Sequence, residues 1–332
     1  MNESRGSIAL SEYATLIAGT DVLDAHDLHP VLLGLFGEVG GIMATAKKHV
    51  RDGNRYPGYE KAALEEFGDT FWYLAAICRR LNIDLDGLFS EASSRDAYKV
   101  IGIASDVAGG TCASVAVPLS TESLDARLFK LGRSAASLLD GTPSRSNLVA
   151  FAHDYLEALN GVKLVFSDVV RGNLRKARGA FVEPDQSHLI DFDESFGTEE
   201  QLPRKFAIRV NQRRSGKTYL QWQGVFIGDP LTDNMGDPDG YRFHDVFHLA
   251  NAAILHWSPV MRALIKHKRK SIAAYDDAED GGRAIVVEEG VTAWIFTQAK
   301  DLAFFEGQER VSLGLLKTIG EFVSGFEAEK LP

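Results

Sequence analysis

The chain has 332 residues, of which 45% are hydrophobic and 25% charged, and it carries a formal net charge of −10. This length and composition indicate a globular protein of two or three domains, and the acidic balance argues against a general nucleic-acid or membrane-surface binder. Cys78 and Cys112 are the two cysteines, which excludes a disulfide framework and a cysteine-rich zinc site. The first residues lack a long apolar run, so we expect no signal peptide and a cytoplasmic location.

The first strong pattern is a pair of amphipathic helices within residues 32–74, preceded by a shorter helix over residues 11–20. Apolar residues recur at helical spacing in both members of the pair. Residues 52–58, which are rich in Gly, Pro and Asn, separate them and predict a loop. We therefore expect two antiparallel helices, the second running from about residue 60 to residue 81.

Acidic residues interrupt the apolar faces of both helices. Glu66 and Asp69 lie three residues apart and share one helix face, and Glu38 of the partner helix can point at the same place. Converging carboxylates are unfavourable unless a cation lies between them, and Mg²⁺ prefers oxygen ligands. The alternative is that these acids are solvated helix surface, with Glu65 and Glu66 favouring a helix N-terminus. We predict a Mg²⁺ site at Glu38, Glu66 and Asp69, which Mn²⁺ could also occupy.

Two segments resemble the MazG-type all-α nucleotide pyrophosphohydrolases: GLFGEVGGIMATAKKHVRDG and EEFGDTFWYLAAICRRLNIDLDGLF. That family carries Glu-x-x-Glu, a spacer and Glu-x-x-Asp, binds Mg²⁺, and hydrolyses nucleoside triphosphates to monophosphate and pyrophosphate. By this resemblance, which spans residues 11–98, Glu38 matches the first Glu, and Glu66 and Asp69 match the last pair. Gly41 stands where the family has its second Glu, so one metal ligand of the family is missing.

Further groups are needed for substrate binding and proton transfer. Basic residues close the first of the two helices, and Lys48 among them is our candidate for binding a substrate phosphate. Basic side chains also suit a helix C-terminus without any ligand, which is the alternative. Glu65 is the candidate catalytic carboxylate that accepts the proton of the attacking water.

Residues 121–182 are again helical and resemble a decayed copy of the first unit. LFKLGRSAASLL aligns with LGLFGEVGGIMA, and LVAFAHDYLEAL aligns with LEEFGDTFWYLA. In this alignment Arg133 replaces Glu38 and His153 replaces Asp69, so we expect the copy to have lost its metal-binding acids. The alternative is that any two amphipathic hairpins can be aligned in this way.

The copy retains a different part of the site. In the family, an Asn followed by a Lys after the acidic helices often reaches the substrate phosphates. The first unit has Ser93 and Asp96 at the matching positions, whereas the copy has Asn173 and Lys176, three residues apart. We therefore predict a single site that combines the acids of the first half with Asn173 and Lys176 as substrate-binding residues. Alternatively, Lys176 and its basic neighbours merely suit a helix C-terminus.

Residues 183–203 are acidic and turn-rich, and we place the main domain boundary there. Beyond it, residues 205–214 and 217–229 predict two strands around Ser215–Gly216, which is one hairpin. From Tyr241 onward the pattern is helical.

A second constellation of chemically active side chains lies in this C-terminal part. His244 and His248 are four residues apart on one helix face, beside Asp245, as in half of a metal site. Glu288 and Glu289 interrupt an apolar helix, where acids need partners. These residues predict either a functional metal-type site or a buried His–Glu network that joins two helices. The arrangement resembles a C-terminal domain that accompanies some MazG-like proteins.

The sequence thus predicts a mainly α protein with these parts: a MazG-like unit at 1–99, a linker with some strand character at 100–120, a degenerate MazG-like repeat at 121–182, an acidic linker at 183–203, and an α-rich domain with one β-hairpin at 204–332. The favoured function is Mg²⁺-dependent hydrolysis of nucleoside triphosphates.

Two alternatives remain for the function. Either the C-terminal His, Asp and Glu residues hold a metal for hydrolysis and the MazG-like part is a scaffold or nucleotide sensor, or the protein is a non-catalytic nucleotide-binding regulator. The expected partner is a nucleoside triphosphate rather than a nucleic acid or a membrane, and the chain could form a homo-oligomer.

Overall fold

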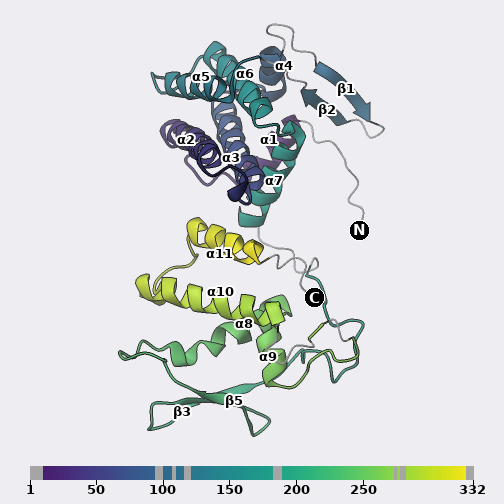
Figure 1. Ribbon diagram of the computed structural model, residues 1–332, viewed down its shortest axis with the longest axis vertical. Coiled ribbons are helices and arrows are strands. Elements are labelled where there is room, and N and C mark those ends of the chain that lie inside the picture. Colours follow the sequence, from purple (N-terminus) through teal and green to yellow (C-terminus); the bar gives the residue numbers. More distant parts are fainter. Residues whose placement is uncertain are drawn as a thin grey trace. The chain divides into compact units, whose positions relative to one another are not determined.

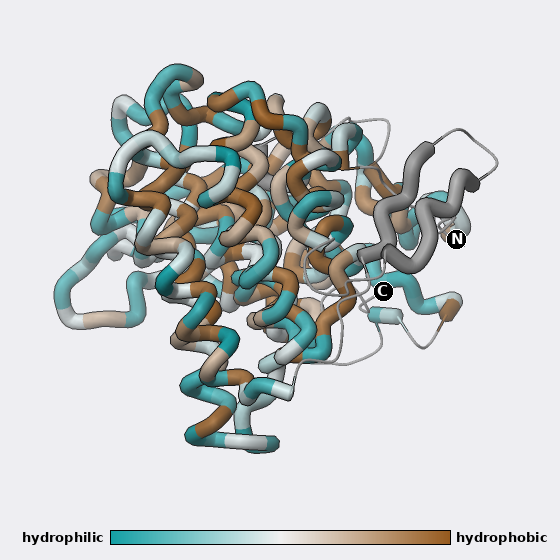
Figure 2. Tube along the Cα trace, turned by 90° about the horizontal axis from the view of Figure 1, so that it is seen from above, coloured by the Kyte–Doolittle hydropathy of each residue, from teal (hydrophilic) through white to brown (hydrophobic). Residues whose placement is uncertain are grey.

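A computed structural model describes residues 10–93, 100–106, 110–115, 121–181, 189–272, 275–276 and 282–326. The chain divides into two compact units, residues 1–183 and 184–332 (Figure 1). Helices dominate both units, which confirms the mainly α fold. Figure 2 shows hydrophobic and hydrophilic residues alternating along the helices, as expected of helices that bury one face.

The N-terminal unit is a bundle of helices. They are α1 (Leu10–Ala18), α2 (His29–Asp52), α3 (Tyr59–Arg80), α4 (Leu85–Ser93), α5 (Leu124–Ser137), α6 (Arg145–Gly161) and α7 (Phe166–Phe181). The expected antiparallel pair is α2 and α3, which pack against each other. The turn between them contains Gly53 and Gly58 at φ of 53° and 78°, a left-handed conformation that favours glycine. Pro30 stands in the first turn of α2, where its missing N–H leaves no helical hydrogen bond unmade.

Aromatic side chains form the centre of the bundle. Phe67 and Phe71 of α3, Phe89 of α4 and Tyr155 of α6 are all fully buried, and Phe71 makes edge-on contacts with Phe89. The Tyr155 hydroxyl donates a 2.9 Å hydrogen bond to the backbone carbonyl of Phe67, so its buried polar atom has a partner. This core holds α3 in a fixed rotation about its axis.

The helix contacts follow the pattern expected of two related three-helix units. If α5, α6 and α7 are the counterparts of α2, α3 and α4, then the contact of α3 with α7 has its equivalent in the contact of α6 with α4. The contact of α2 with α5 maps onto itself under the same exchange. Two copies of one unit related by a local two-fold axis would make such contacts, and the repeat itself stays a prediction.

Residues 100–120 contain more regular structure than a linker requires. Strands β1 (Val100–Asp106) and β2 (Gly110–Val115) pair in antiparallel register, with Asp106 opposite Gly110. The expected strand character therefore takes the form of a hairpin.

Helix α2 and the 3₁₀ turn that follows it, together His29–Arg55, are long and apolar enough to cross a membrane by length and composition alone. The apolar face of α2 packs in the core of the bundle, where Val31, Leu35 and Val39 are almost fully buried. A core helix that packs on its neighbours accounts for this composition.

The C-terminal unit combines a small sheet with helices. Its elements are β3 (Ile208–Gln212), β4 (Thr218–Trp222), β5 (Val225–Leu231), η3 (Tyr241–Phe243), α8 (Asp245–Leu255), α9 (Pro259–Leu264), α10 (Gly282–Asp301), η4 (Ala303–Phe305) and α11 (Leu313–Gly325). The strands form an antiparallel sheet in the order β3–β4–β5. The predicted hairpin around Ser215–Gly216 is β3–β4. The second expected strand, residues 217–229, divides into β4 and β5 because the chain turns back at Gln223 and Gly224, both of which have positive φ.

Part of the expected acidic linker belongs to the folded C-terminal unit. Asp193 is almost fully buried and accepts two hydrogen bonds of 2.7 and 2.9 Å from the Arg262 guanidinium of α9. It also accepts a 2.7 Å bond from the backbone N–H of Leu202. The acidic composition suggested a solvated segment, but this carboxylate neutralises a buried arginine instead.

Replacing Asp193 by Ala should destabilise the C-terminal unit by about 3–5 kcal/mol, because the Arg262 guanidinium would stay buried without its main counter-charge. Three of the four tryptophans lie in this unit, so urea unfolding followed by tryptophan fluorescence reports on it. The matched control is Asp191→Ala, which removes a more exposed carboxylate of the same segment and should cost at most about 1 kcal/mol. Equal unfolding midpoints for the two variants would contradict the assignment of this segment to the C-terminal fold.

Candidate functional site

The predicted acids lie on the facing helices α2 and α3 and are half-buried. Glu66 reaches across to α2, where its carboxylate rests on the backbone at Gly41. A Cβ atom added at Gly41 would lie 2.0 Å from Glu66 Oε2, so any larger residue would push that carboxylate aside. Gly41 is one helical turn beyond Glu38, which places the Glu66 carboxylate on the face of α2 that carries Glu38.

The other two acids, Glu38 and Asp69, both lie near the Tyr73 hydroxyl. Burial raises the pKa of the Tyr73 hydroxyl, and the nearby carboxylates of Glu38 and Asp69 raise it further. Both carboxylates therefore act on one phenol, from two different helices. The Tyr73 ring packs onto Gly34, where a Cβ would lie 2.2 Å from Cε1. Gly34 and Gly41 are seven residues apart, so one glycine-lined face of α2 admits side chains of α3.

Helix α7 brings the basic and amide groups to the same acids. Lys176 Nζ lies 2.7 Å from Glu65 Oε1 and 2.5 Å from Asp69 Oδ2. Asn173 Nδ2 donates a 3.1 Å hydrogen bond to Asp69 Oδ1. These contacts join residues more than 100 positions apart in the sequence. They are possible because α7 approaches α3 closely at Gly68, where an added Cβ would lie 3.0 Å from Asn173 Cβ.

Asn173 contacts the Asp69 carboxylate and is itself held by a buried tyrosine. Its side chain is almost fully buried, and its Oδ1 accepts a 2.8 Å hydrogen bond from the hydroxyl of buried Tyr13. The tyrosine fixes the orientation of the amide, which in turn holds the Asp69 carboxylate. Burial raises the pKa of Tyr13 well above its usual value, with further contributions from Tyr155 and Asp69, so the phenol remains a donor. In this geometry Asn173 orients Asp69, and its predicted contact with a substrate phosphate stays a prediction.

Lys48 is exposed near the end of α2, one turn before Asp52. It follows Gly41 by two helical turns, beyond the acids rather than among them. Its predicted contact with a phosphate stays a prediction.

The donor atoms of the acidic site suit a hard cation. Carboxylate oxygens are the ligands that Mg²⁺ prefers, and the Gly41 position leaves space for one of them against α2. Among the described residues, the groups that bring three ligand atoms within 4.8 Å of one another do not include the set Glu38, Glu66 and Asp69. Like charges separate without a cation between them, and Lys176 supplies part of the compensating charge.

Helix α6, which lies in the predicted degenerate copy, has an acidic group that the alignment did not predict. His153, Asp154 and Glu157 of α6 bring their ligand atoms within 4.8 Å of one another, and all three are partly exposed. The expectation that the copy has lost its metal-binding acids rested on the aligned positions, such as Arg133 at Glu38 and His153 at Asp69, whereas Asp154 and Glu157 occupy neighbouring positions.

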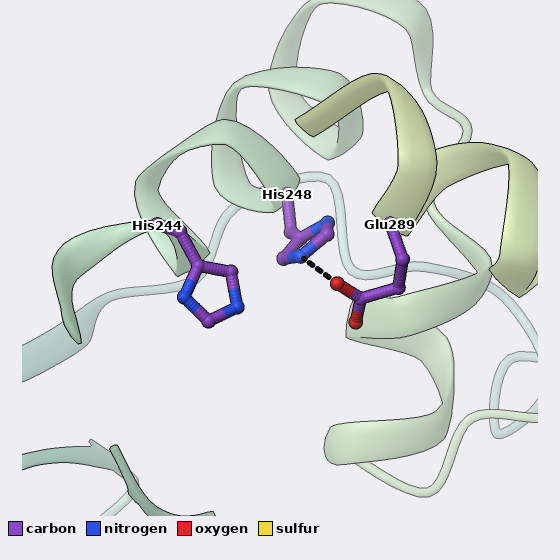
Figure 3. Close-up of side chains that lie close together, drawn as sticks. All are labelled: His244, His248 and Glu289. Atoms are coloured by element: carbon purple, nitrogen blue, oxygen red, sulfur yellow. Dashed lines mark ion pairs between the residues drawn. The ribbon is translucent and has the colours of Figure 1, made fainter. Parts of the chain in front are cut away.

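The C-terminal unit assembles the second predicted constellation from α8 and α10. The Nδ1 atom of His248 lies 3.0 Å from Glu288 Oε1, and its Nε2 atom lies 3.6 Å from Glu289 Oε2. Figure 3 shows the His248 ring between His244 and Glu289, with the Glu289 carboxylate directed at it. Asp245 Oδ1 lies 3.4 Å from His244 Nε2 and 4.0 Å from His248 Nε2.

The two adjacent glutamates of α10 have different surroundings. Glu288 is buried and accepts hydrogen bonds from the Ser258 hydroxyl at 2.6 Å and the Val260 N–H at 2.9 Å, besides its contact with His248. The Glu289 side chain is 42% exposed. Burial lowers the pKa of His248, but its hydrogen bond to Glu288 and its ion pair with Glu289 outweigh this and raise the pKa to about 9. Burial raises the pKa of Asp245, and contact with His248 lowers that of Glu289.

Comparisons with known proteins bear on this C-terminal unit. Residues 187–332 match the family model of the MazG C-terminal domain, which is less than half of the chain. No curated protein and no solved structure matches the sequence. The match confirms the resemblance of the C-terminal part to a domain that accompanies MazG-like proteins, and it supports a MazG-related protein. It does not extend to the acidic helices α2 and α3.

Proposed function

We propose that the N-terminal unit hydrolyses nucleoside triphosphates to monophosphate and pyrophosphate with the help of Mg²⁺. The observation that carries this proposal is the meeting of α3 and α7, where Lys176 and Asn173 contact Glu65 and Asp69. Acidic ligands for a metal and a cation for phosphate oxygens are both needed for phosphoanhydride hydrolysis. Each half of the bundle supplies only some of these groups.

Glu38, Glu66 and Asp69 would hold the metal ion, which when bound neutralises phosphate charge and acidifies the attacking water. Glu65 precedes Glu66 on α3, and its contact with Lys176 would hold it in position for accepting the proton. The Lys176 side chain is 35% exposed, so its ammonium group can exchange a carboxylate partner for a phosphate oxygen.

The ion pairs of Lys176 also favour a second candidate function. A lysine that stays bound to Glu65 and Asp69 would compensate the acids permanently. The unit would then bind nucleotides without turnover and act as a regulator. Turnover measurements on variants of the acids and of Lys176 separate the two functions.

We expect Glu66→Gln to abolish pyrophosphate release while the fold stays intact. The substitution keeps the side-chain volume but removes one anionic ligand, and loss of a ligand should cost at least the about 10- to 100-fold typical of outer-shell losses. Glu60→Gln is the matched control, because Glu60 is exposed in the first turn of the same helix. Wild-type turnover in Glu66→Gln, with circular dichroism unchanged, would contradict the metal assignment.

Two neighbouring glycines of α2 test whether the contact of the Glu66 carboxylate with the backbone at Gly41 matters for turnover. Gly40→Ala should raise helix stability by up to about 1 kcal/mol without affecting turnover, since a Cβ there meets nothing within 4 Å. Gly41→Ala should lower kcat at least tenfold, because its Cβ displaces the Glu66 carboxylate. Gly41→Glu, which restores the acid of the family pattern, should displace Glu66 in the same way. Equal kcat for Gly40→Ala and Gly41→Ala would show that the carboxylate position is unimportant.

Lys176→Ala should raise KM or lower kcat/KM for a nucleoside triphosphate if the ammonium binds a phosphate in the reacting complex. Arg175→Ala is the control, because Arg175 is the exposed neighbour on α7. An increase in turnover on removing Lys176 would mean that the lysine only competes with the metal for Glu65 and Asp69. Nucleotide binding by wild type and variants alike, with turnover in neither, would instead support the regulatory function.

A further inference from the structure

His248 carries a buried nitrogen that the fold leaves without a hydrogen bond. Its side chain is fully buried, and within the described part of the chain its Nε2 atom has no hydrogen-bond partner. This atom is directed toward the ligand atoms of His244 and Glu289, and the three lie within 4.8 Å of one another. A buried polar atom without a partner is unfavourable, so the arrangement requires a reason.

Hydrogen bonds on the far side of each ring fix which nitrogen can bind a cation. The Nδ1 atom of His248 faces Glu288 Oε1 at 3.0 Å, and the Nδ1 atom of His244 faces the Tyr241 carbonyl oxygen at 2.8 Å. Both oxygens only accept, so each Nδ1 donates its proton. In the neutral rings, the two Nε2 atoms then carry lone pairs. Glu289 Oε2 lies 3.6 Å from that of His248, and Asp245 Oδ1 lies 3.4 Å from that of His244.

We propose that His244 Nε2, His248 Nε2 and a carboxylate oxygen of Glu289 bind a divalent transition-metal ion of the Zn²⁺ class. Two imidazole nitrogens and one carboxylate are a ligand set for such ions and not for Mg²⁺. The two units would therefore take different metals, with an all-oxygen site on α2 and α3 and a nitrogen-rich site on α8 and α10.

The surroundings of the three ligands are those of a metal centre. Glu288 holds the distal nitrogen of His248 and is itself held by Ser258 and the Val260 N–H, which is the carboxylate–histidine arrangement that orients metal ligands. The Tyr241 ring stacks on His244 at 4.3 Å and restrains it. His248 Nε2 and Glu289 Oε2 are 3.6 Å apart, close to the about 3.3 Å expected between two ligands of a tetrahedral Zn²⁺ ion.

Three protein ligands leave at least one coordination position for a water or an anionic oxygen, as in catalytic zinc sites. The exposed Glu289 side chain marks the side open to solvent. A cavity of about 800 Å³ in the same unit has Glu288 and Asn251 in its lining but none of the three proposed ligands. Ligand exchange at the metal therefore takes place on the Glu289 side.

The test is a Zn²⁺ titration of the full chain by calorimetry, in the Glu66→Gln background so that the acids of α2 and α3 contribute less. We expect one strongly bound ion per chain, and a Co²⁺ derivative with the visible absorption of a nitrogen-ligated low-symmetry site. His244→Ala and Glu289→Gln should each weaken binding by at least tenfold, and Glu288→Gln by about 10- to 100-fold through misplacement of His248. His256→Asn is the matched control, since His256 follows α8 in a left-handed conformation that Asn tolerates.

Glu289→Gln keeps the proposal testable if the buried variants fail to fold, because its side chain is partly exposed. Zn²⁺ affinity that is the same in the Glu66→Gln protein with and without His244→Ala or Glu289→Gln would overturn the proposal. The cluster would then be an ion-pair network that joins α8 to α10. Loss of the Co²⁺ spectrum in Glu289→Gln but not in His256→Asn would support it.

Discussion

The N-terminal unit depends on compensation of the acids that α2 and α3 bring together. Half-buried carboxylates on facing helices repel one another unless positive charge or hydrogen-bond donors hold them. Helix α7 supplies both, through Lys176 at Glu65 and Asp69 and through Asn173 at Asp69. Because α7 comes from the second half of the bundle, neither half could build this site alone. Helix α3 packs on α7 and α4 packs on α6, so each half of the bundle contacts the other.

The sequence predicted the helices better than the turns and strands. The 3.6-residue recurrence of apolar side chains is strong in α2 and α3, and their expected bounds agree closely with the structure. The turn at Gln223 and Gly224 was missed because a short apolar segment with one glycine also fits a single long strand. The burial of Asp193 was missed because its partner, Arg262, is distant in sequence.

Sequence patterns located the candidate sites but did not assign a role to each residue. They could not show that Tyr13 orients Asn173, because the two residues are 160 positions apart. Nor could they distinguish Glu288 from Glu289, since which neighbour faces inward depends on the rotation of α10. Gly41 was interpreted as the position of a missing ligand, and the pattern could not show that the Glu66 carboxylate rests on it. The glycines of α2 were a usable signal, because a glycine within a long helix often marks a close approach.

Identification of the phosphorus products from a panel of nucleoside triphosphates tests the central claim most directly. Purified protein would be incubated with each nucleotide and Mg²⁺ or Mn²⁺, and the products resolved by ³¹P NMR spectroscopy. The account predicts equal amounts of pyrophosphate and nucleoside monophosphate from at least one nucleotide, with formation dependent on the divalent ion. Orthophosphate and nucleoside diphosphate as the products would contradict the account. Nucleotide binding without any turnover across the panel would also contradict it.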